Sequence, residues 1–416
     1  MDINNFNKVC VVGCGTSGIS LCDLLLELGK KVKVSESRKK NCFKDSLIQE
    51  YLSKGIVFEF GLNSKDFIKD CDLVVLSPGV DPVAIRSFLK DTGIPCVGEI
   101  EFSFWFNKAL CVAITGTNGK TTSTYLTHKV LEATGRRVFI GGNIGTPFSS
   151  FVLKTTREDI VVLELSSFQL ETIIEFHPYV AVLLNVAPDH FDRYNNLQEY
   201  ILAKMNIFKN QLSGDRALLN KNLESLAMSS GNIKAQIMYF SDEFPNENFS
   251  CIWRIAEIFG VDKKICRKVF SEFKGLSHRM QSVRKIKGVE FINDSKATNP
   301  ASTVWALDNI LSPVVLLAGG KDKGLDYSEV VSHLGRVKKV NLFGEAASKI
   351  EDSLESFCRV EVFCSFQEAV ISAFREAVSG DTVLLSPMCA SFDMFSDYKE
   401  RGDRFVEIVN GLQQAD

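Results

Sequence analysis

The stretch Ala113-Ile114-Thr115-Gly116-Thr117-Asn118-Gly119-Lys120-Thr121-Thr122 decides how the centre of this 416-residue chain folds. An apolar run of strand length precedes the glycines, and a segment with helical spacing, Ser123 to Glu132, follows them. A glycine-rich turn between a strand and a helix directs backbone N–H groups and the positive end of the helix towards a phosphate. Lys120 supplies a cation for the β- and γ-phosphates, and the Thr121 hydroxyl is placed to bind magnesium.

This turn is shorter than the usual phosphate loop. Ile114 stands where the first glycine of the common pattern would fall. The alternative is an ordinary Gly-Asn turn before a helix. Because Lys120 and two threonines follow Gly119 directly, we predict a nucleoside triphosphate site instead.

Length and composition set limits on the kind of protein. The length predicts two to four domains, and a net charge of −3 gives no reason to expect nucleic acid or an anionic membrane as a partner. The sequence has no apolar stretch long enough to span a bilayer and no signal peptide, so we expect a cytoplasmic protein. The 12 cysteines contain no Cys-x-x-Cys pair and are expected to be buried thiols that form neither disulfides nor a zinc site.

The first hundred residues have the pattern of a nucleotide-binding unit. A short strand, Val9 to Val12, leads into Gly13-Cys14-Gly15-Thr16-Ser17-Gly18 and an apolar helix. A second strand ends at Glu36, near the place of the acid that binds ribose in dinucleotide-binding folds. An NAD-linked oxidoreductase is therefore one hypothesis. Arg38 favours another nucleotide, since a guanidinium stacks on or hydrogen-bonds a planar base, although it could equally be a solvated surface charge.

Two further polar groups follow strands in the centre of the chain. Glu164 ends the apolar run from Ile160, where ligands of parallel sheets gather, so we expect it to hold magnesium. The alternative for Glu164 is a carboxylate at the start of a helix. His190 lies in a loop after the next strand, Val180 to Leu184, among carboxylates.

Lys204 stands within the apolar stripe of a helix that begins at Leu197. A desolvated ammonium is costly, so such a lysine loses its proton or finds a partner. A neutral amine near a metal could react with carbon dioxide to give a carbamate. From the pattern alone, a lysine that reaches water or pairs with an acid is the favoured interpretation.

Three loops after strands characterise the last part of the chain. They begin at Asn293, at Ala318 and at Ser386, and together they offer ammonium groups, hydroxyls and a glycine-rich backbone. This set suits an amino acid with more than one carboxylate, such as glutamate. Each loop taken alone could also be a solvated turn.

These motifs together resemble the ATP-dependent Mur ligase family. The resemblance rests on Thr115 to Thr122, Gly141-Gly142-Asn143, Glu164 to Leu170 and Asp189-His190. It implies three α/β domains: a Rossmann-like nucleotide-sugar domain at 1–98, a central P-loop ATPase-like parallel-sheet domain at 99–275, and a C-terminal Rossmann-like amino-acid domain at 276–416. It implies a ligase that joins an amino acid to a UDP-linked muramoyl acceptor through an acyl phosphate.

The C-terminal motifs are most similar to the D-glutamate-adding members of the family, whose acceptor is UDP-N-acetylmuramoyl-L-alanine. Asn293 to Asn299 and Ser386 to Phe395 carry this similarity, and the Asp-Asn-Pro-Arg string of relatives that add other amino acids is absent. The adenine motif departs from the family pattern, because Phe244-Pro245-Asn246-Glu247-Asn248, before a helix expected from Phe249, lacks its histidine. Tyr398 stands where the D-glutamate-adding members often have phenylalanine.

The resemblance also implies a role for each site residue. The catalytic group is Lys120, Glu164, His190, Lys204 and Arg279. ATP is expected at Gly116, Thr117, Asn118, Gly119, Lys120, Thr121, Thr122, Asn248, His278, Arg279 and Asp294. The UDP-sugar is expected at Thr16, Glu36, Ser37, Arg38, Ser77, Asn143 and His190, and D-glutamate at Lys296, Thr298, Lys323, Ser391 and Tyr398. Two magnesium ions are expected at Thr121, Glu164, His190 and a carbamoylated Lys204.

Other classes of function remain open from the sequence. Besides the oxidoreductase, a P-loop regulatory switch would hydrolyse ATP without an acceptor amine, but it would leave the C-terminal polar loops without a role. Within the ligases, the rival is a Mur ligase that adds a different amino acid. We expect small-molecule substrates, no nucleic acid, no membrane insertion and a monomer.

Overall fold

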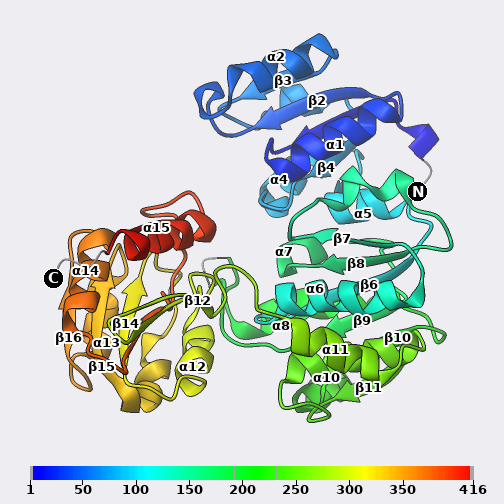
Figure 1. The fold of residues 1–416 in the computed structure, drawn as a ribbon. Coiled ribbons are helices and arrows are strands. Elements are labelled where there is room, and N and C mark those ends of the chain that lie inside the picture. Colours follow the sequence, from blue (N-terminus) through cyan, green and yellow to red (C-terminus); the bar gives the residue numbers. More distant parts are fainter. Residues whose placement is uncertain (1–2, 192, 231–232, 413–416) are drawn as a thin grey trace. The chain divides into compact units, whose positions relative to one another are not determined.

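The computed structural model describes residues 3–191, 193–230 and 233–412. The chain divides into two compact units. The first combines Met1–Asn185 with Ile201–Glu272, and the second combines Val186–Tyr200 with Phe273–Asp416. Two sheets lie in the first unit and one in the second (Figure 1).

The first sheet has the strand order β3-β2-β1-β4-β5, and all its pairings are parallel. Its strands are β1 Lys8–Val12, β2 Lys31–Glu36, β3 Val57–Phe60, β4 Leu73–Leu76 and β5 Cys96–Gly98. Its helices are α1 Thr16–Glu27, α2 Asp45–Ser53, α3 Lys65–Ile68 and α4 Pro82–Leu89. The carboxyl ends of β2, β1 and β4 are neighbours, so the turns that follow these strands meet at one edge, where ligands bind in such sheets.

The second sheet has the order β11-β10-β9-β6-β8-β7 and is also parallel throughout. Its strands are β6 Leu110–Thr115, β7 Val138–Gly142, β8 Ile160–Glu164, β9 Val180–Leu183, β10 Arg216–Asn220 and β11 Gln236–Phe240. Its helices are α5 Glu99–Phe104, α6 Lys120–Leu131, α7 Ser167–Leu170, α8 Leu197–Met205, α9 Glu224–Ser230, α10 Glu247–Ile258 and α11 Lys263–Glu272. Strands β8 and β9 are buried along their whole length, as continuous apolar runs in a covered parallel sheet should be.

The third sheet, in the second unit, has the order β12-β13-β17-β14-β15-β16. Only β12 runs antiparallel to its neighbour among these described strands. The strands are β12 Gln281–Ile286, β13 Val289–Asn293, β14 Val314–Gly319, β15 Val337–Phe343, β16 Val360–Val362 and β17 Thr382–Leu385. The helices are α12 Pro300–Asp308, η8 Tyr327–Arg336, α13 Ala347–Leu354, α14 Phe366–Glu376 and α15 Tyr398–Gly411.

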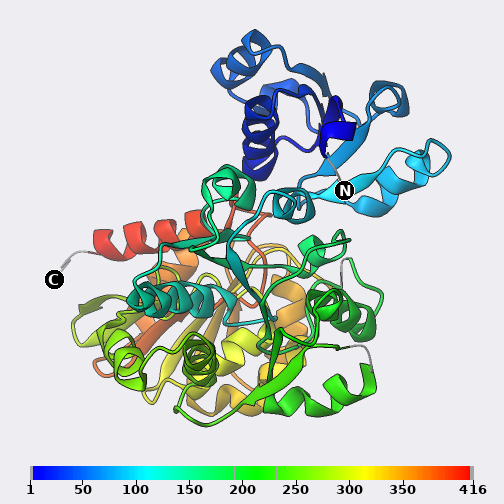
Figure 2. The ribbon, with the colours of Figure 1, turned by 90° about the vertical axis from the view of Figure 1, so that its right-hand side faces the viewer.

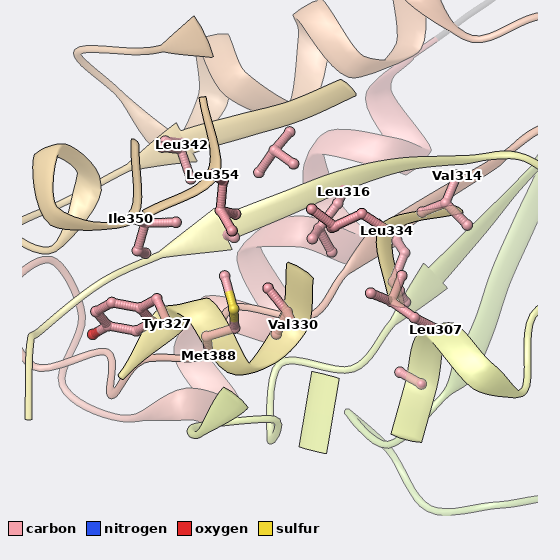
Figure 3. Packing of buried hydrophobic residues seen from close by; sticks show 14 of the residues in the cluster. Leu307, Val314, Leu316, Tyr327, Val330, Leu334, Leu342, Ile350, Leu354 and Met388 are labelled. Atoms are coloured by element: carbon pink, nitrogen blue, oxygen red, sulfur yellow. The ribbon is translucent and has the colours of Figure 1, made fainter. Parts of the chain in front are cut away.

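Apolar side chains alternate between the two faces of this third sheet. Leu316 and Leu342 pack with α12, η8 and α13 on one face, and Figure 3 shows these side chains converging with Met388. Val315, Leu317 and Phe343 pack on the other face with α14 and α15, which are orange and red in Figures 1 and 2. Each such fully buried side chain contributes about 1.5–3 kcal/mol to the stability of the fold through the hydrophobic effect. This packing holds the strand ends in place, and with them the loops that follow.

The α/β class expected from the sequence is confirmed. Two helix starts were wrong: α6 begins at Lys120, three residues before the expected Ser123, and α10 begins at Glu247, two residues before the expected Phe249. The side chain of Asn246 caps the helix by accepting a hydrogen bond from Asn248 N at 2.9 Å. Asn248 therefore belongs to the first turn of the helix.

Candidate functional site

The glycine turn after β6 adopts the form expected of a phosphate loop. Strand β6 ends at Thr115, and α6 begins at Lys120. Gly119 caps the helix with a φ of 78°, a left-handed conformation that glycine adopts without steric cost. A Cβ added to Gly119 would lie 2.5 Å from Asn248 Oδ1, so the structure brings two of the predicted ATP-binding residues together. Thr121 and Thr122 lie in the first turn of α6.

The ammonium group of Lys120 folds back over the loop. Its Nζ donates to Gly116 O at 2.8 Å and to Thr117 O at 2.7 Å. Lys204 Nζ also donates to Gly116 O, at 2.8 Å, from the buried side of the loop. Two cationic groups thus meet at one carbonyl oxygen, which makes this place attractive to an anion.

The pattern alone favoured a lysine that either reaches water or pairs with an acid. Lys204 is only 1% exposed, so the first of these two alternatives is excluded. The helix α8 carries it into the apolar interior, and the carbonyl of Gly116 takes the place of solvent for its ammonium group. This hydrogen bond offsets part of the cost of burying the ammonium group.

Asn185 braces the phosphate loop, and sequence reasoning assigned it no role. Its Oδ1 accepts from Thr117 N at 3.1 Å and from Asn118 N at 2.8 Å, while its Nδ2 donates to Asn118 O at 3.1 Å. Its backbone oxygen also accepts from Thr117 N at 3.0 Å. The available signal was a polar residue two positions after the end of the apolar strand β9, which is the neighbour of β6 in the sheet.

Glu164 ends β8, beside the loop, and is 1% exposed. Its Oε1 accepts from Asn143 Nδ2 at 2.8 Å, which brings two further predicted site residues together. Its Oε2 is buried and has no hydrogen-bond partner among the described residues. A desolvated carboxylate oxygen without a donor is costly, and a bound cation would satisfy it, so the residues present fit a magnesium ion here.

No other arrangement typical of a metal site occurs in the described part of the chain. Nowhere in it do three or more His, Cys, Asp or Glu side chains gather to hold an ion. The twelve cysteines are free thiols; most are buried as expected, but Cys42 and Cys364 are exposed. A magnesium ion at Glu164 would therefore take hydroxyl, phosphate and water oxygens as its other ligands, which is how this ion is usually bound beside nucleotides.

At the edge of the first sheet, Glu36 connects the glycine-rich turn after β1 with Arg38, which follows β2. Its carboxylate accepts from Cys14 N at 2.7 Å, from Arg38 N at 2.8 Å and from the Arg38 guanidinium at 2.9 and 3.0 Å. Burial alone would raise the pKa of Glu36, but the hydrogen bonds from Arg38 and Cys14 lower it below the usual value. The Cζ atom of Arg38 also lies over the Phe43 ring, 4.7 Å from its centroid.

Three more of the residues predicted for the UDP-sugar lie around the same edge. Thr16 is the first residue of α1, and Ser77, which is nearly buried, directly follows β4. Ser37 directly follows β2 and is exposed. The turn of Gly13 to Ser17 and the ends of β2 and β4 therefore lie together.

A cavity of about 560 Å³ lies at the carboxyl ends of β10 and β11. Its lining includes Asn220, Phe244 and Glu247, and Asn220 Nδ2 donates to Glu247 Oε2 at 2.8 Å. This places an open space next to the segment where the resemblance implied an adenine contact.

In the second unit, Asp189 connects two loops. It is 4% exposed, and its carboxylate accepts from Lys323 Nζ at 2.8 Å and from Asn299 Nδ2 at 3.0 Å. Burial opposes ionisation of Asp189, but the charges of Lys323 and His190 lower its pKa to about 2. Lys323, predicted to hold an amino-acid carboxylate, therefore already carries a carboxylate partner from the protein.

His190 has a left-handed backbone, with a φ of 59°. Its backbone N–H donates to Asp189 Oδ1 at 2.8 Å, and its Nε2 lies 3.8 Å from Asp189 Oδ2. The ring packs against Tyr200, with 6.0 Å between ring centroids. A non-glycine residue held in this conformation is uncommon and is often found at functional sites.

Asp294, predicted to bind ATP, is almost completely buried. It accepts from Met280 N and Ser386 Oγ, both at 3.2 Å, and burial raises its pKa to about 7. His278 is also nearly buried, lies next to Asn293 Nδ2 at 3.1 Å, and has a pKa lowered by burial. The backbone N–H of Arg279 donates to Leu276 O. His278 and Arg279 thus lie in the turn before β12, and Asp294, directly after β13, contacts the same turn through Met280 N.

The residues predicted for D-glutamate follow neighbouring strands of the third sheet. Lys296 and Thr298 lie after β13, Lys323 after β14, and Ser391 after β17. Lys296 Nζ lies 3.8 Å from the centroid of the Tyr398 ring, an arrangement typical of a cation–π interaction. Because β13, β17 and β14 are adjacent, these groups share one sheet edge.

Three family profiles match the chain. They are the Mur ligase MurD-like N-terminal domain over residues 7–98, the Mur ligase middle domain over residues 114–272, and the Mur ligase glutamate ligase domain over residues 278–389. None of the helices within residues 3–191, 193–230 and 233–412 has both the length and the apolar character needed to cross a membrane.

Curated relatives match over nearly the whole chain. The UDP-N-acetylmuramoylalanine--D-glutamate ligase of Thermoanaerobacter sp. (strain X514) is 38% identical and covers 98% of this chain and 99% of its own length. The proteins of the same name from Alkaliphilus oremlandii and Koribacter versatilis are both 37% identical, with coverage of 98% and 100% of this chain.

Solved structures share the fold at low sequence identity. The UDP-N-acetylmuramate-alanine ligase MurC of Thermotoga maritima has a TM-score of 0.60 and 17% identity, covering 98% of this chain and 100% of its own. The MurF ligase of Thermotoga maritima, solved in complex with ADP, has a TM-score of 0.59 and 16% identity, covering 99% and 98%. On the strength of the full-length relatives, the chain belongs to the Mur ligase family, as its motifs predicted.

Proposed function

We propose that this protein joins D-glutamate to UDP-N-acetylmuramoyl-L-alanine in a reaction driven by ATP, in the synthesis of peptidoglycan precursors. The observation that carries the proposal is the shortened phosphate loop, with Glu164 beside it, in a chain that matches ligases of this name from end to end. The reaction class is amide-bond formation with release of ADP and phosphate.

The chemistry needs ATP because a carboxylate is a poor acyl donor. In the proposed first step, an oxygen of the alanine carboxylate bonds to the γ-phosphorus of ATP, and ADP leaves, which yields an acyl phosphate. The amine of D-glutamate then attacks the carbonyl carbon, phosphate leaves, and the amine loses a proton. Lys120 and Arg279 are proposed to offset the negative charge on the transferring group.

Glu164 and Thr121 are proposed to hold one magnesium ion, and His190 with Lys204 a second. The unsatisfied Oε2 of Glu164 supports the first site. Magnesium would supply positive charge at the phosphate oxygens. Asn143 holds the Glu164 carboxylate in place through its Nδ2, so the orientation of Glu164 does not depend on a ligand.

We propose that Lys204 is carbamoylated in the working enzyme. Its Nζ shares the Gly116 oxygen with the Nζ of Lys120, at 2.8 Å from each. Converting Lys204 to a carbamate would replace one of two like charges by an anion, and the buried position would protect the carbamate from bulk water.

Substrate binding is proposed at the sheet edges described above. The UDP-sugar is assigned to Thr16, Glu36, Ser37, Arg38, Ser77, Asn143 and His190. ATP is assigned to the loop from Gly116 to Thr122, with Asn248, His278, Arg279 and Asp294. D-Glutamate is assigned to Lys296, Thr298, Lys323, Ser391 and Tyr398. We further propose domains at 1–98, 99–275 and 276–416, a monomer, and a cytoplasmic location, where ATP and UDP-sugars are available.

The test is an ADP-release assay with the purified protein and a panel of substrates. We expect ADP release only when ATP, UDP-N-acetylmuramoyl-L-alanine and D-glutamate are all present, with the amide product formed in equal amount. Equal rates with L-glutamate, L-lysine or diaminopimelate would contradict the proposed amino acid. ADP release without any acceptor would instead indicate an ATPase switch.

A further inference from the structure

Arg401, in α15, is the largest side chain of the described core that is fully buried, with an exposure of 0%. It lies one turn after Tyr398, the first residue of that helix. Burial lowers its pKa to about 10, so the guanidinium remains charged at neutral pH. A buried charge is costly unless hydrogen bonds satisfy it. Arg401 has no carboxylate partner among the described residues, and its acceptors are carbonyl groups and one hydroxyl.

Those acceptors lie in two loops and at the end of a third strand. Nε donates to Ser295 Oγ at 3.0 Å and Nη2 to Ser295 O at 2.8 Å, in the loop after β13. Nη2 and Nη1 donate to Cys389 O at 3.0 Å and Ala390 O at 3.2 Å, after β17. Nη1 also lies 3.4 Å from Gly319 O, at the end of β14. The planar fork of one arginine thus joins segments at the carboxyl ends of three adjacent strands.

Each acceptor is close in sequence to a residue proposed to bind D-glutamate. Ser295 precedes Lys296, and Ala390 precedes Ser391. Ser295 Oγ also donates to Tyr398 O at 2.8 Å, which ties the same loop to the start of α15. Gly320 leaves room for the guanidinium, since a Cβ there would lie 3.0 Å from Arg401 Nη1 and 2.2 Å from Ala390 O.

We propose that Arg401 is a positioning residue that sets the spacing of the three amino-acid-binding loops, and thereby the affinity for D-glutamate. This inference rests on the proposed function for the identity of the ligand. Arg401 would not touch the substrate. It would hold the hydroxyl and ammonium groups of the loops at the separation that two carboxylates require.

The test compares Arg401→Lys with Arg404→Lys. Lysine at 401 keeps the charge but cannot donate to all three segments at once. Arg404 lies on the same helix and pairs at the surface with Glu407 at 2.6 Å and with Gln367 at 2.9 Å, so its replacement is a matched control. We expect Arg401→Lys to raise the KM for D-glutamate on the order of 100-fold, with KM values for ATP and the UDP-sugar near those of the wild type. Arg404→Lys should change none of the three.

Hydrogen exchange provides a readout that does not depend on the ligand. In Arg401→Lys, the amides of the loops at 293–299, 319–324 and 386–393 should exchange faster, while the strands of the same sheet keep their protection. If the activity of the wild-type enzyme does not depend on D-glutamate, the proposed function is contradicted. If the amides of these loops exchange at the wild-type rate in the variant, the role of Arg401 is overturned. Faster exchange throughout the sheet, or an equal rise in all three KM values, would also overturn it, because it would indicate a general structural role.

Ser295→Ala serves if Arg401→Lys fails to fold. It removes the acceptor of Arg401 Nε and the link to Tyr398 but leaves the guanidinium and its carbonyl partners in place. A selective rise in the KM for D-glutamate, smaller than that of Arg401→Lys, is expected. An unchanged KM for D-glutamate would overturn the proposal.

Discussion

Replacing Asn185 by alanine tests the bracing of the phosphate loop. The change removes an acceptor used by Thr117 N and Asn118 N, and the donor to Asn118 O. At about 1 kcal/mol for each hydrogen bond, the loop would lose at most about 3 kcal/mol. The backbone oxygen of Asn185 still accepts from Thr117 N, and the half-buried site admits water, so about 1–2 kcal/mol is the expected loss. That corresponds to an affinity for ATP about 5- to 30-fold weaker.

The assay is calorimetric titration of the protein with a non-hydrolysable ATP analogue and magnesium. Asn210→Ala is the control, because its Nδ2 donates to Ile174 O and Phe176 O in the same unit, outside the phosphate loop. Both variants are expected to unfold at a slightly lower temperature than the wild type. Only Asn185→Ala should bind the analogue more weakly. A wild-type Kd for Asn185→Ala would refute the reasoning that Asn185 orders the loop.

Three further predictions concern single side chains. Lys120→Ala should reduce ADP formation by at least about 100-fold while UDP-sugar binding persists; substantial ligase activity would exclude the proposed phosphate loop. Lys204→Ala should be inactive and partly rescued by short carboxylates, whereas normal activity would exclude the carbamate. The raised pKa of Asp294, about 7 against 3.8, means that the folded state holds this proton more tightly than the unfolded chain. Asp294 therefore contributes fully to the free energy of unfolding below about pH 4. As the pH rises through about 7 this contribution, at most about 4 kcal/mol, is lost. In urea unfolding, the stability of Asp294→Asn should not show this dependence on pH.

The sheet and the placement of its ligand-binding edge could be predicted from local sequence. The run from Leu110 to Ile114 and the run from Ile160 to Leu163 are continuously apolar, and each ends in a polar or glycine-rich segment. Such runs are typical of parallel strands covered on both faces. Because strands of one parallel sheet end at the same edge, Glu164 was expected next to the phosphate loop, and β6 and β8 are indeed neighbours.

The side chains that hold the loops of the site in place through long-range hydrogen bonds could not be predicted in this way. Asn185 contacts residues 67 and 68 positions earlier, and Arg401 contacts Ser295 across 106 positions. Local pattern contains no information on which distant carbonyl a buried side chain will meet. Lys204 illustrates the same limit: its place in an apolar stripe predicted a cost, but the acceptor that offsets this cost, Gly116 O, lies 88 residues away.

The start of α10 depended on a capping choice. Asn246 and Asn248 are both good caps, so the sequence alone left the boundary open by two residues. The structure uses Asn246, which leaves the side chain of Asn248 next to Gly119.

The central claim is that ATP activates the alanine carboxylate as an acyl phosphate. Its most direct test uses UDP-N-acetylmuramoyl-L-alanine labelled with oxygen-18 in that carboxylate, incubated with the enzyme, ATP and D-glutamate. Mass spectrometry of the released phosphate should find one labelled oxygen per molecule of amide formed. Amide formation with unlabelled phosphate would contradict the account.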